Sequence, residues 1–206
     1  MGKLFYVIGK SSTGKDSIAK MLLEDKDLGL SEIIQYTTRP KRDGEEEGRE
    51  YHFISNETAE RFDAEGRIIE LRAYHTVHGL WQYMMVDDGS IDLTKRSYLA
   101  VGTVEAYGKL CRHFPEEAVV PIYIDVETGE RLYRAVLRER KSEHPKYAEL
   151  CRRFLADEAD FSDEHLRAAG LMDENGVIRN RIENGDLETC VAEIRALILK
   201  ETDERQ

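Results

Sequence analysis

The sequence predicts an α/β domain in which a mainly parallel central sheet is flanked by helices. A short apolar run, Leu4–Ile8, leads into a glycine-rich segment and then into a helical pattern over residues 15–26. Two further apolar runs, 98–101 and 119–124, alternate with helical patterns, as strands of a parallel sheet do. The chain has 206 residues, of which 41% are apolar, so one compact domain with its own core is expected.

The net charge of the chain limits which kinds of binding partner are expected. The net charge is −11, so neither a nucleic-acid polymer nor an anionic membrane is expected as a partner. A small anionic ligand is compatible with this balance where positive charge gathers locally. Residues 131–153 contain eight Lys or Arg against three Glu, which reverses the overall sign. This stretch is therefore a candidate to meet an anionic ligand.

The N-terminus and the cysteines indicate a cytoplasmic protein. The first apolar run has only five residues, too few for a signal peptide or a membrane span. Cys111, Cys151 and Cys190 lie far apart and form no CxxC pair, so they are interpreted as reduced and mostly packing residues. We expect a monomer or a small homo-oligomer in the cytoplasm.

The local pattern assigns several other segments. Residues 130–160 are interpreted as helical, and residues 36–53 as polar chain in which the run GEEEGRE is a solvated surface loop. His75 and His78 are interpreted as loop residues without a metal role. A last helix is predicted to follow an N-cap at Asp186, because four apolar residues then share one face: Leu187, Val191, Ile194 and Ile198.

The stretch GKSSTGKDS, residues 9–17, predicts a phosphate-binding loop. Its glycines let backbone N–H groups turn toward phosphate oxygens, and the following helix N-terminus adds partial positive charge. Lys15 would reach the β- and γ-phosphates. A glycine-rich turn that only caps a helix is the alternative, which the preceding strand disfavours. The predicted nucleotide-binding residues are Gly9, Lys10, Ser11, Ser12, Thr13, Gly14, Lys15, Asp16 and Ser17.

An aspartate stands where such loops usually place the hydroxyl that ligates Mg²⁺. Ser17 supplies a hydroxyl one place later and is the predicted metal ligand. Asp16 is then either a stabiliser of the first helical turn or an outer-shell partner of the ion.

A second motif, YTTRPKRDGEEEGREYHF at residues 36–53, suits a phosphate monoester. Arg39 and Arg42 supply two planar guanidinium forks, and Tyr51 supplies a hydroxyl. The stretch resembles the acceptor motif of the guanylate kinase family, although the proline stands one place forward at Pro40. The matching residues are TTR at 37–39, Arg42, Gly44-Glu45, Gly48 and Tyr51-His52-Phe53.

Further similarities to this family follow in order along the chain. Ile69-Glu70 is similar to the family's base-reading segment, and RFLADEADF at 153–161 to one of its lid helices. Asn184–Leu187 resembles the family's start of the last helix. Four arginines are similar to the family's lid arginines: Arg134, Arg138, Arg152 and Arg153.

The resemblance implies a P-loop nucleoside-kinase fold with mobile acceptor-binding and lid regions. It implies one domain over residues 1–206, with a core of 1–35, 91–125 and 166–206, an acceptor-binding region of 36–90 and a lid of 126–165. The implied reaction is ATP-dependent phosphorylation of a nucleoside monophosphate, GMP or dGMP, with Mg²⁺ as cofactor. The implied catalytic residues are Lys15, Arg138 and Arg153.

The resemblance also assigns binding residues. It places Asn184 near the adenine of ATP. The implied acceptor-binding residues are Thr38, Arg39, Arg42, Glu45, Tyr51, Glu70 and Tyr83.

Two departures concern the acceptor site. Gly102 stands where the family has an acidic residue, and Gln35 where a serine is common. They leave open a related kinase for another small phosphorylated acceptor, such as a deoxynucleotide or a ribose phosphate. A third hypothesis is a non-catalytic guanylate-kinase-like module that binds proteins. The presence of Lys15, Arg138 and Arg153 favours an enzyme.

Overall fold

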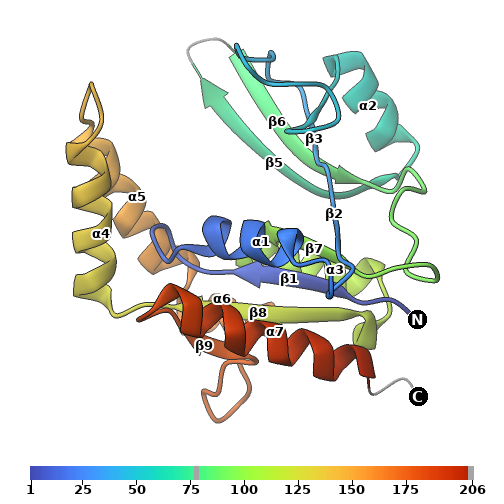
Figure 1. The fold of residues 1–206 in the computed structure, drawn as a ribbon. Coiled ribbons are helices and arrows are strands. Elements are labelled where there is room, and N and C mark those ends of the chain that lie inside the picture. The colour runs from blue at the N-terminus through green and yellow to red at the C-terminus, as the bar shows by residue number, and fades with distance from the viewer. Residues whose placement is uncertain (77–78, 204–206) are drawn as a thin grey trace.

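A five-stranded parallel sheet forms the centre of the molecule (Figure 1). The computed structural model describes residues 1–76 and 79–203. All neighbouring strands of this sheet run parallel, which confirms the predicted fold class. In spatial order the strands are β2 (Ser31–Glu32), β7 (Tyr98–Gly102), β1 (Leu4–Ile8), β8 (Val119–Asp125) and β9 (Arg181–Glu183).

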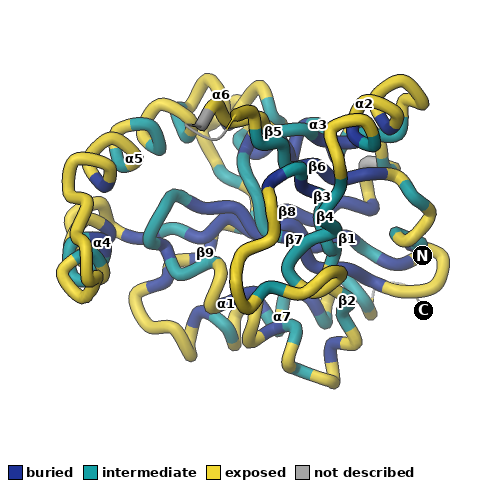
Figure 2. Tube along the Cα trace, turned by 90° about the horizontal axis from the view of Figure 1, so that it is seen from above, coloured by how far each residue is buried: buried dark blue, intermediate teal, exposed yellow. Residues whose placement is uncertain are grey.

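Helices cover both faces of the sheet, and β1 is buried on both (Figure 2). Phe5 and Val7 point to the face packed by α1 (Lys15–Glu24) and α7 (Leu187–Asp203). Leu4, Tyr6 and Ile8 belong to the opposite core, against α3 (Val104–His113) and α6 (Asp163–Ala168). A short 3₁₀ helix, Glu116–Ala118, precedes β8.

A second, four-stranded sheet lies beside the core and contains most of the predicted acceptor-binding region (Figure 1). Its Ile69 and Met85 join the α3 core cluster, so the two units share apolar contacts. Its other face packs on α2 (Asn56–Ala64) through Ala59 and Phe62. The strand order is β4 (His52–Phe53), β3 (Tyr36–Thr37), β6 (Gly79–Val86) and β5 (Ile68–Thr76).

The β5–β6 hairpin corrects one assignment. His75 lies in β5 and pairs with Leu80 across the hairpin, so its assignment to a loop was wrong. Antiparallel hydrogen bonding stabilises this strand although its outer half is exposed, and exposure weakens the apolar pattern of a strand. His78 lies outside the described residues.

The predicted helical stretch 130–160 is two helices, α4 (Thr128–Arg140) and α5 (Tyr147–Asp160). They pack side by side and project from the core as a mostly exposed hairpin (Figures 1 and 2). Pro145 lies in the connection, where it disfavours helical geometry in the residue before it.

Other local predictions have mixed outcomes. Asp186 accepts a hydrogen bond from the Thr189 N–H at 2.9 Å, which confirms it as the cap of α7. Cys190 is buried and Cys111 packs against the core, whereas Cys151 is exposed on α5, so two of the three cysteines are packing residues. Within the described chain, no helix is long and apolar enough to cross a membrane.

Gly102 ends β7 at a point that leaves no room for a side chain. A Cβ atom there would overlap the Tyr6 hydroxyl oxygen and lie 2.6 Å from Tyr6 Cζ. Tyr6 is 1% exposed and stacks on Tyr107, with ring centroids 6.3 Å apart. Burial raises the pKa of the Tyr6 hydroxyl, and the nearby Glu70 carboxylate raises it further. The absence of a side chain at position 102, where the family has an acidic residue, is therefore matched by the position of the Tyr6 hydroxyl.

We predict that Gly102→Ala lowers the free energy of unfolding by about 1–3 kcal/mol, because the added methyl would overlap the buried Tyr6 side chain. Urea unfolding measures the effect. The control is Gly185→Ala, where a Cβ meets no atom within 4 Å. In a Tyr6→Phe background the cost is expected to shrink, since the nearest atom is gone. Equal stability of the two alanine variants would contradict the overlap.

Candidate active site

The predicted phosphate loop connects β1 to α1 and is braced from behind. The Thr13 hydroxyl donates to the Lys10 carbonyl at 2.9 Å. The Asn184 side-chain amide donates to the Thr13 carbonyl at 2.7 Å, and Asn184 is itself buried. A Cβ on Gly14 would lie 2.7 Å from this amide, and Gly14 has a φ of 87°. Only glycine fits both the backbone angle and the brace.

The front of the loop keeps polar groups available for a ligand. Gly14 caps α1 without a side-chain hydrogen bond, so the first N–H groups of the helix face outward. Ser12 has a φ of 68°, and its buried hydroxyl has no hydrogen-bond partner among the described residues. Buried polar groups in native proteins normally have partners. A phosphate group would supply one here, since helix N-termini attract anions.

Two cavities meet beside the loop, with volumes of about 550 and 630 Å³. Both sizes are typical of small-molecule sites. The first extends to the acceptor-binding region through Tyr51, Tyr83 and Trp81. The second extends to α5 through Asp157 and Asp160. Five residues line both cavities: Lys15, Arg72, Tyr74, Gly102 and Thr103.

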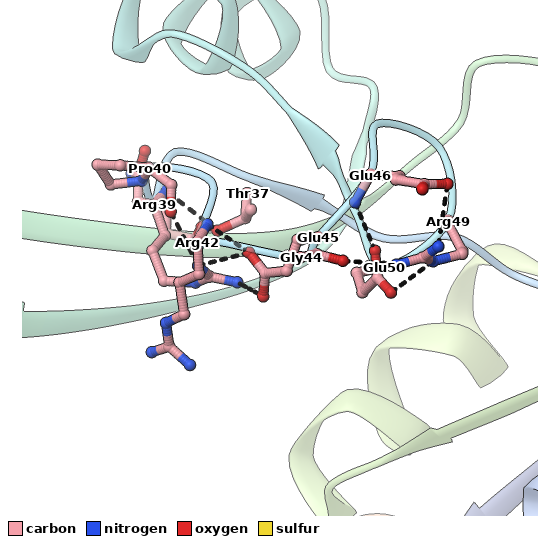
Figure 3. A network of polar contacts seen from close by, with 10 residues as sticks. Thr37, Arg39, Pro40, Arg42, Gly44, Glu45, Glu46, Arg49 and Glu50 are labelled. Carbon is pink, nitrogen blue, oxygen red and sulfur yellow. Dashed lines mark hydrogen bonds and ion pairs between the residues drawn. The ribbon is translucent and has the colours of Figure 1, made fainter.

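Arg39 and Glu45 form the centre of the acceptor motif (Figure 3). The guanidinium donates to both Glu45 oxygens, at 2.8 and 3.0 Å, and Arg39 is 3% exposed. Arg39 lowers the pKa of the Glu45 carboxyl, and Glu45 raises that of Arg39. Arg39 also lies over the Tyr51 and Phe53 rings, 5.6 and 5.7 Å from their centroids. Its charge is thus already matched by a carboxylate.

The other predicted acceptor residues divide into two groups. Tyr51 and Tyr83 line the first cavity with ring centroids 5.5 Å apart. Thr38 instead accepts a hydrogen bond from the Gln82 N–H at 3.0 Å and ties its segment to β6. Arg42 donates to Glu45 through its backbone, while its guanidinium extends away from the Arg39–Glu45 pair (Figure 3).

Glu70 pairs with Arg72, a residue that the sequence analysis did not select. Arg72 Nε lies 2.7 Å from Glu70 Oε1 but is not aligned for a hydrogen bond. Glu70 is 2% exposed and lines neither cavity, whereas Arg72 lines both. Burial raises the pKa of Glu70, and Arg72 opposes the shift. The one available signal was spacing, because residues two apart on a strand share a face.

The lid hairpin touches the phosphate loop through a cluster that sequence reasoning also missed. The Ser11 N–H donates to Asp157 Oδ2 at 2.8 Å, and Lys10 Nζ lies 2.7 Å from Glu158 Oε2. Arg131 pairs with both carboxylates and is 1% exposed. Its guanidinium stacks 3.9 Å from the Phe154 ring centroid. A carboxylate thus occupies one N–H of the loop.

The predicted lid arginines lie elsewhere. Arg138 and Arg153 are exposed and line neither cavity, and Arg153 lies 3.9 Å from Glu149. Arg134 pairs with Glu130 and donates to the Asn184 carbonyl at 3.0 Å. Lys15 is therefore the one predicted catalytic residue that this arrangement brings to the cavities.

The two candidate metal ligands also differ in position. Both residues are exposed, but Asp16 lines the first cavity and Ser17 lines neither cavity. Among the described residues, no group of three or more His, Cys, Asp or Glu is arranged to hold a metal ion.

Comparisons with a family model, with related sequences and with solved structures all indicate the same family. Residues 1–81 match the family model described as guanylate kinase. A guanylate kinase of Symbiobacterium thermophilum is 30% identical over 201 residues, which cover 97% of this chain and 86% of that protein. A human guanylate kinase is 28% identical over 96% of this chain and 93% of its own length. The crystal structure of guanylate kinase from Anaplasma phagocytophilum has the same fold, with a TM-score of 0.62, 23% identity and coverage of 97% and 86%.

We predict that Asp157→Asn tightens binding of a non-hydrolysable ATP analogue by roughly 3- to 10-fold. The asparagine keeps the acceptor oxygen but loses the charge that competes with phosphate at the Ser11 N–H. Isothermal titration calorimetry measures the dissociation constant. Asp160→Asn is the control, because it makes the same charge change further along α5. No difference between the two variants would show that the Asp157 contact does not compete with nucleotide.

Proposed function

Because the chain belongs to the guanylate kinase family, we propose that it transfers the γ-phosphoryl group of ATP to GMP or dGMP. The observation that carries this proposal is the phosphate loop, with its uncapped helix terminus and unpartnered Ser12 hydroxyl. Lys15 faces a cavity that continues to the acceptor motif. Phosphoryl transfer depends mainly on position and charge, and this arrangement supplies both.

On the donor side, the loop residues hold the triphosphate and Lys15 neutralises charge on its transferring end. Asn184 acts there through its brace on Thr13. The residues present fit Mg²⁺, because a hydroxyl and a carboxylate stand at the start of α1 beside the loop. Ser17 is the proposed ligand, and Asp16 is the alternative. Mg²⁺ held there would supply positive charge that offsets the charge of the donor phosphates.

On the acceptor side, Arg39, Arg42, Tyr51 and Tyr83 are proposed to hold the monophosphate. Guanidinium groups bind a phosphate dianion bidentately, as Arg39 now binds Glu45. An incoming phosphate would take over this pairing. Thr38 would act indirectly, since it ties the motif to β6.

Lid closure is part of the proposal. Arg138 and Arg153 meet the transferring phosphoryl group only if the α4–α5 hairpin moves toward the cavities, because both now face outward. Such closure excludes water, which would otherwise accept the phosphoryl group. The division into core (1–35, 91–125, 166–206), acceptor-binding region (36–90) and lid (126–165) belongs to the same proposal, as does a cytoplasmic monomer or small homo-oligomer.

A related kinase for another small phosphorylated acceptor is the second candidate. The observation that favours it is at Gly102, where the family has an acidic side chain. In this chain the Tyr6 hydroxyl occupies the place of that side chain. A non-catalytic protein-binding module gains no comparable support, since the loop groups that meet phosphate are in place.

We predict that Lys15→Ala keeps the fold but lowers kcat at least ~10²-fold, equivalent to about 3 kcal/mol of barrier. The loss follows because charge on the transferring group is no longer neutralised. A coupled kinase assay and circular dichroism measure the two properties. Lys20→Ala, on the exposed face of the same helix, is the control. Activity of Lys15→Ala within a few-fold of wild type would remove the loop from the mechanism.

We also predict that the wild type prefers GMP or dGMP over AMP by ~10³-fold or more in kcat/KM. A site built on hydrogen bonds rejects a ligand that leaves its polar groups unpaired. Glu70→Ala is expected to lose most of this preference. Glu32→Ala, which changes another carboxylate near the first cavity, should retain it. Equal kcat/KM for GMP and AMP in the wild type would refute the guanine assignment.

A further inference from the structure

Arg72 occupies a central position that no motif assigns to it. Among the described residues, Lys15 and Arg72 are the only Lys or Arg residues that line both cavities. Lys15 belongs to the phosphate loop, so its task follows from the loop. Arg72 extends from β5, on the acceptor side, and faces the same space. A cation at this point meets whatever the first cavity holds beside the phosphate loop.

Two polar side chains hold the Arg72 guanidinium in place. Nη2 donates to Gln35 Oε1 at 2.7 Å, and Nε lies 2.7 Å from Glu70 Oε1. The Arg72 side chain is 24% exposed and that of Glu70 only 2%. The pair is therefore arranged with the carboxylate inside the protein and the guanidinium at the cavity. Any ligand in the cavity reaches Arg72 before it reaches Glu70.

The guanidinium keeps donors for a ligand. A guanidinium carries five N–H groups. The Gln35 contact uses one of those on Nη2, and among the described residues nothing accepts from Nη1. At the end of β7, in the five-stranded sheet, Gly102 contributes no side chain to the cavity, because the Tyr6 hydroxyl fills that space. No carboxylate from position 102 can therefore pair with Arg72.

The surrounding wall suits a planar ring. Tyr74, Trp81, Leu99 and Val101 line the first cavity together with Arg72 and Gln35. Aromatic and aliphatic groups with a few placed polar groups are typical of a site that orients a flat apolar body. The anionic part of an acceptor is already provided for by Tyr51 and Tyr83 nearby.

We propose that Arg72 reads the base of the acceptor, donating to O6 and N7 of guanine, and that Glu70 positions Arg72 instead of touching the base. This inference rests on the proposed function. Arginine binds the O6/N7 edge of guanine bidentately, whereas adenine presents an amino group beside N7. Arg72 therefore favours guanine without any contact to N1 or N2. Gln35 acts with Glu70 to orient the guanidinium.

Base analogues test the assignment on the wild-type protein. IMP keeps O6 and N7 but lacks the amino group at C2, while 7-deaza-GMP keeps that group and lacks N7. We expect kcat/KM for IMP within ~10-fold of GMP and a loss of ~10- to 100-fold for 7-deaza-GMP, the range for a hydrogen bond to a charged group. A large loss for IMP with none for 7-deaza-GMP would overturn the proposal and assign direct reading to Glu70.

Variants separate reading from a general structural role. Arg72→Met should equalise GMP and 7-deaza-GMP and remove most of the preference over AMP. A merely structural role would lower kcat/KM for all acceptors alike, which would also overturn the proposal. Arg112→Met is the control, because Arg112 lines only the second cavity. Melting temperatures monitor folding, since Arg72→Met leaves the buried Glu70 without its partner.

Glu70→Gln tests the positioning role. It is expected to raise KM for GMP while the ratio of GMP to 7-deaza-GMP stays above one, because Arg72 remains. The positioning role would be contradicted if the wild type had a much lower kcat/KM for IMP than for GMP and the Glu70→Gln variant had equal values for the two. Absence of any turnover of GMP by the wild type would refute the proposed function itself, whereas GMP turnover without a 7-deaza effect would refute only the role of Arg72.

Discussion

Burial of β1 on both faces is the constraint on which the rest of the structure depends. Its neighbours β7 and β8 run parallel to it, so the carboxyl ends of all three strands meet at one edge of the sheet. The phosphate loop leaves β1 at that edge, Gly102 ends β7 there, and β8 leads to the lid hairpin. Ligands of open parallel sheets bind at such edges. The cavities therefore lie at the sheet edge where the connections that follow β1, β7 and β8 begin.

Carboxylates occupy several groups that would meet phosphate. Glu45 neutralises Arg39 in the acceptor motif, and Asp157 accepts from the Ser11 N–H in the phosphate loop. Arg131 is buried between Asp157 and Glu158, so the lid carries its own counter-charge to the loop. An unpaired buried guanidinium would be costly, which explains why these cations have partners before any substrate arrives. An anionic ligand then exchanges with a carboxylate instead of entering an empty positive site. Under the proposed function, such an exchange would let a protein of net charge −11 hold phosphates.

Local patterns predicted the elements that local interactions determine. Leu4–Ile8, the loop and the Asp186 cap could be predicted because each depends on neighbours in sequence. The β5–β6 hairpin was missed because its outer half is exposed. Residues 130–160 were predicted to be helical without the break at the turn that contains Pro145, because the charged pattern continues through that turn. The motifs brought Lys15 and Tyr51 to the cavities, as expected of short, ordered signatures. Two of the contacts that were missed join residues far apart in the chain: Arg72 with Gln35, and Ser11 with Asp157. No periodicity reports such pairs, since they arise only when separate units pack together.

The loss of an acidic side chain at Gly102 is linked to the positions of neighbouring polar side chains. In the sequence alone, Gly102 is a lost acidic side chain. In the structure, the Tyr6 hydroxyl fills the space of that side chain from the neighbouring strand, and its pKa responds to both Glu70 and Arg72. An acid at position 102 would overlap Tyr6, and without such an acid Arg72 takes its charge partner from its own strand. Tyr6 is compatible with Gly102 and not with an acidic side chain at that position, because the two side chains would overlap. A buried polar group without partners is costly, so the Tyr6 hydroxyl depends on the polar groups around it, which include Glu70 and Arg72. The departure at Gly102 therefore goes with a rearrangement of polar groups beside the first cavity, in which Tyr6 and Arg72 take part together.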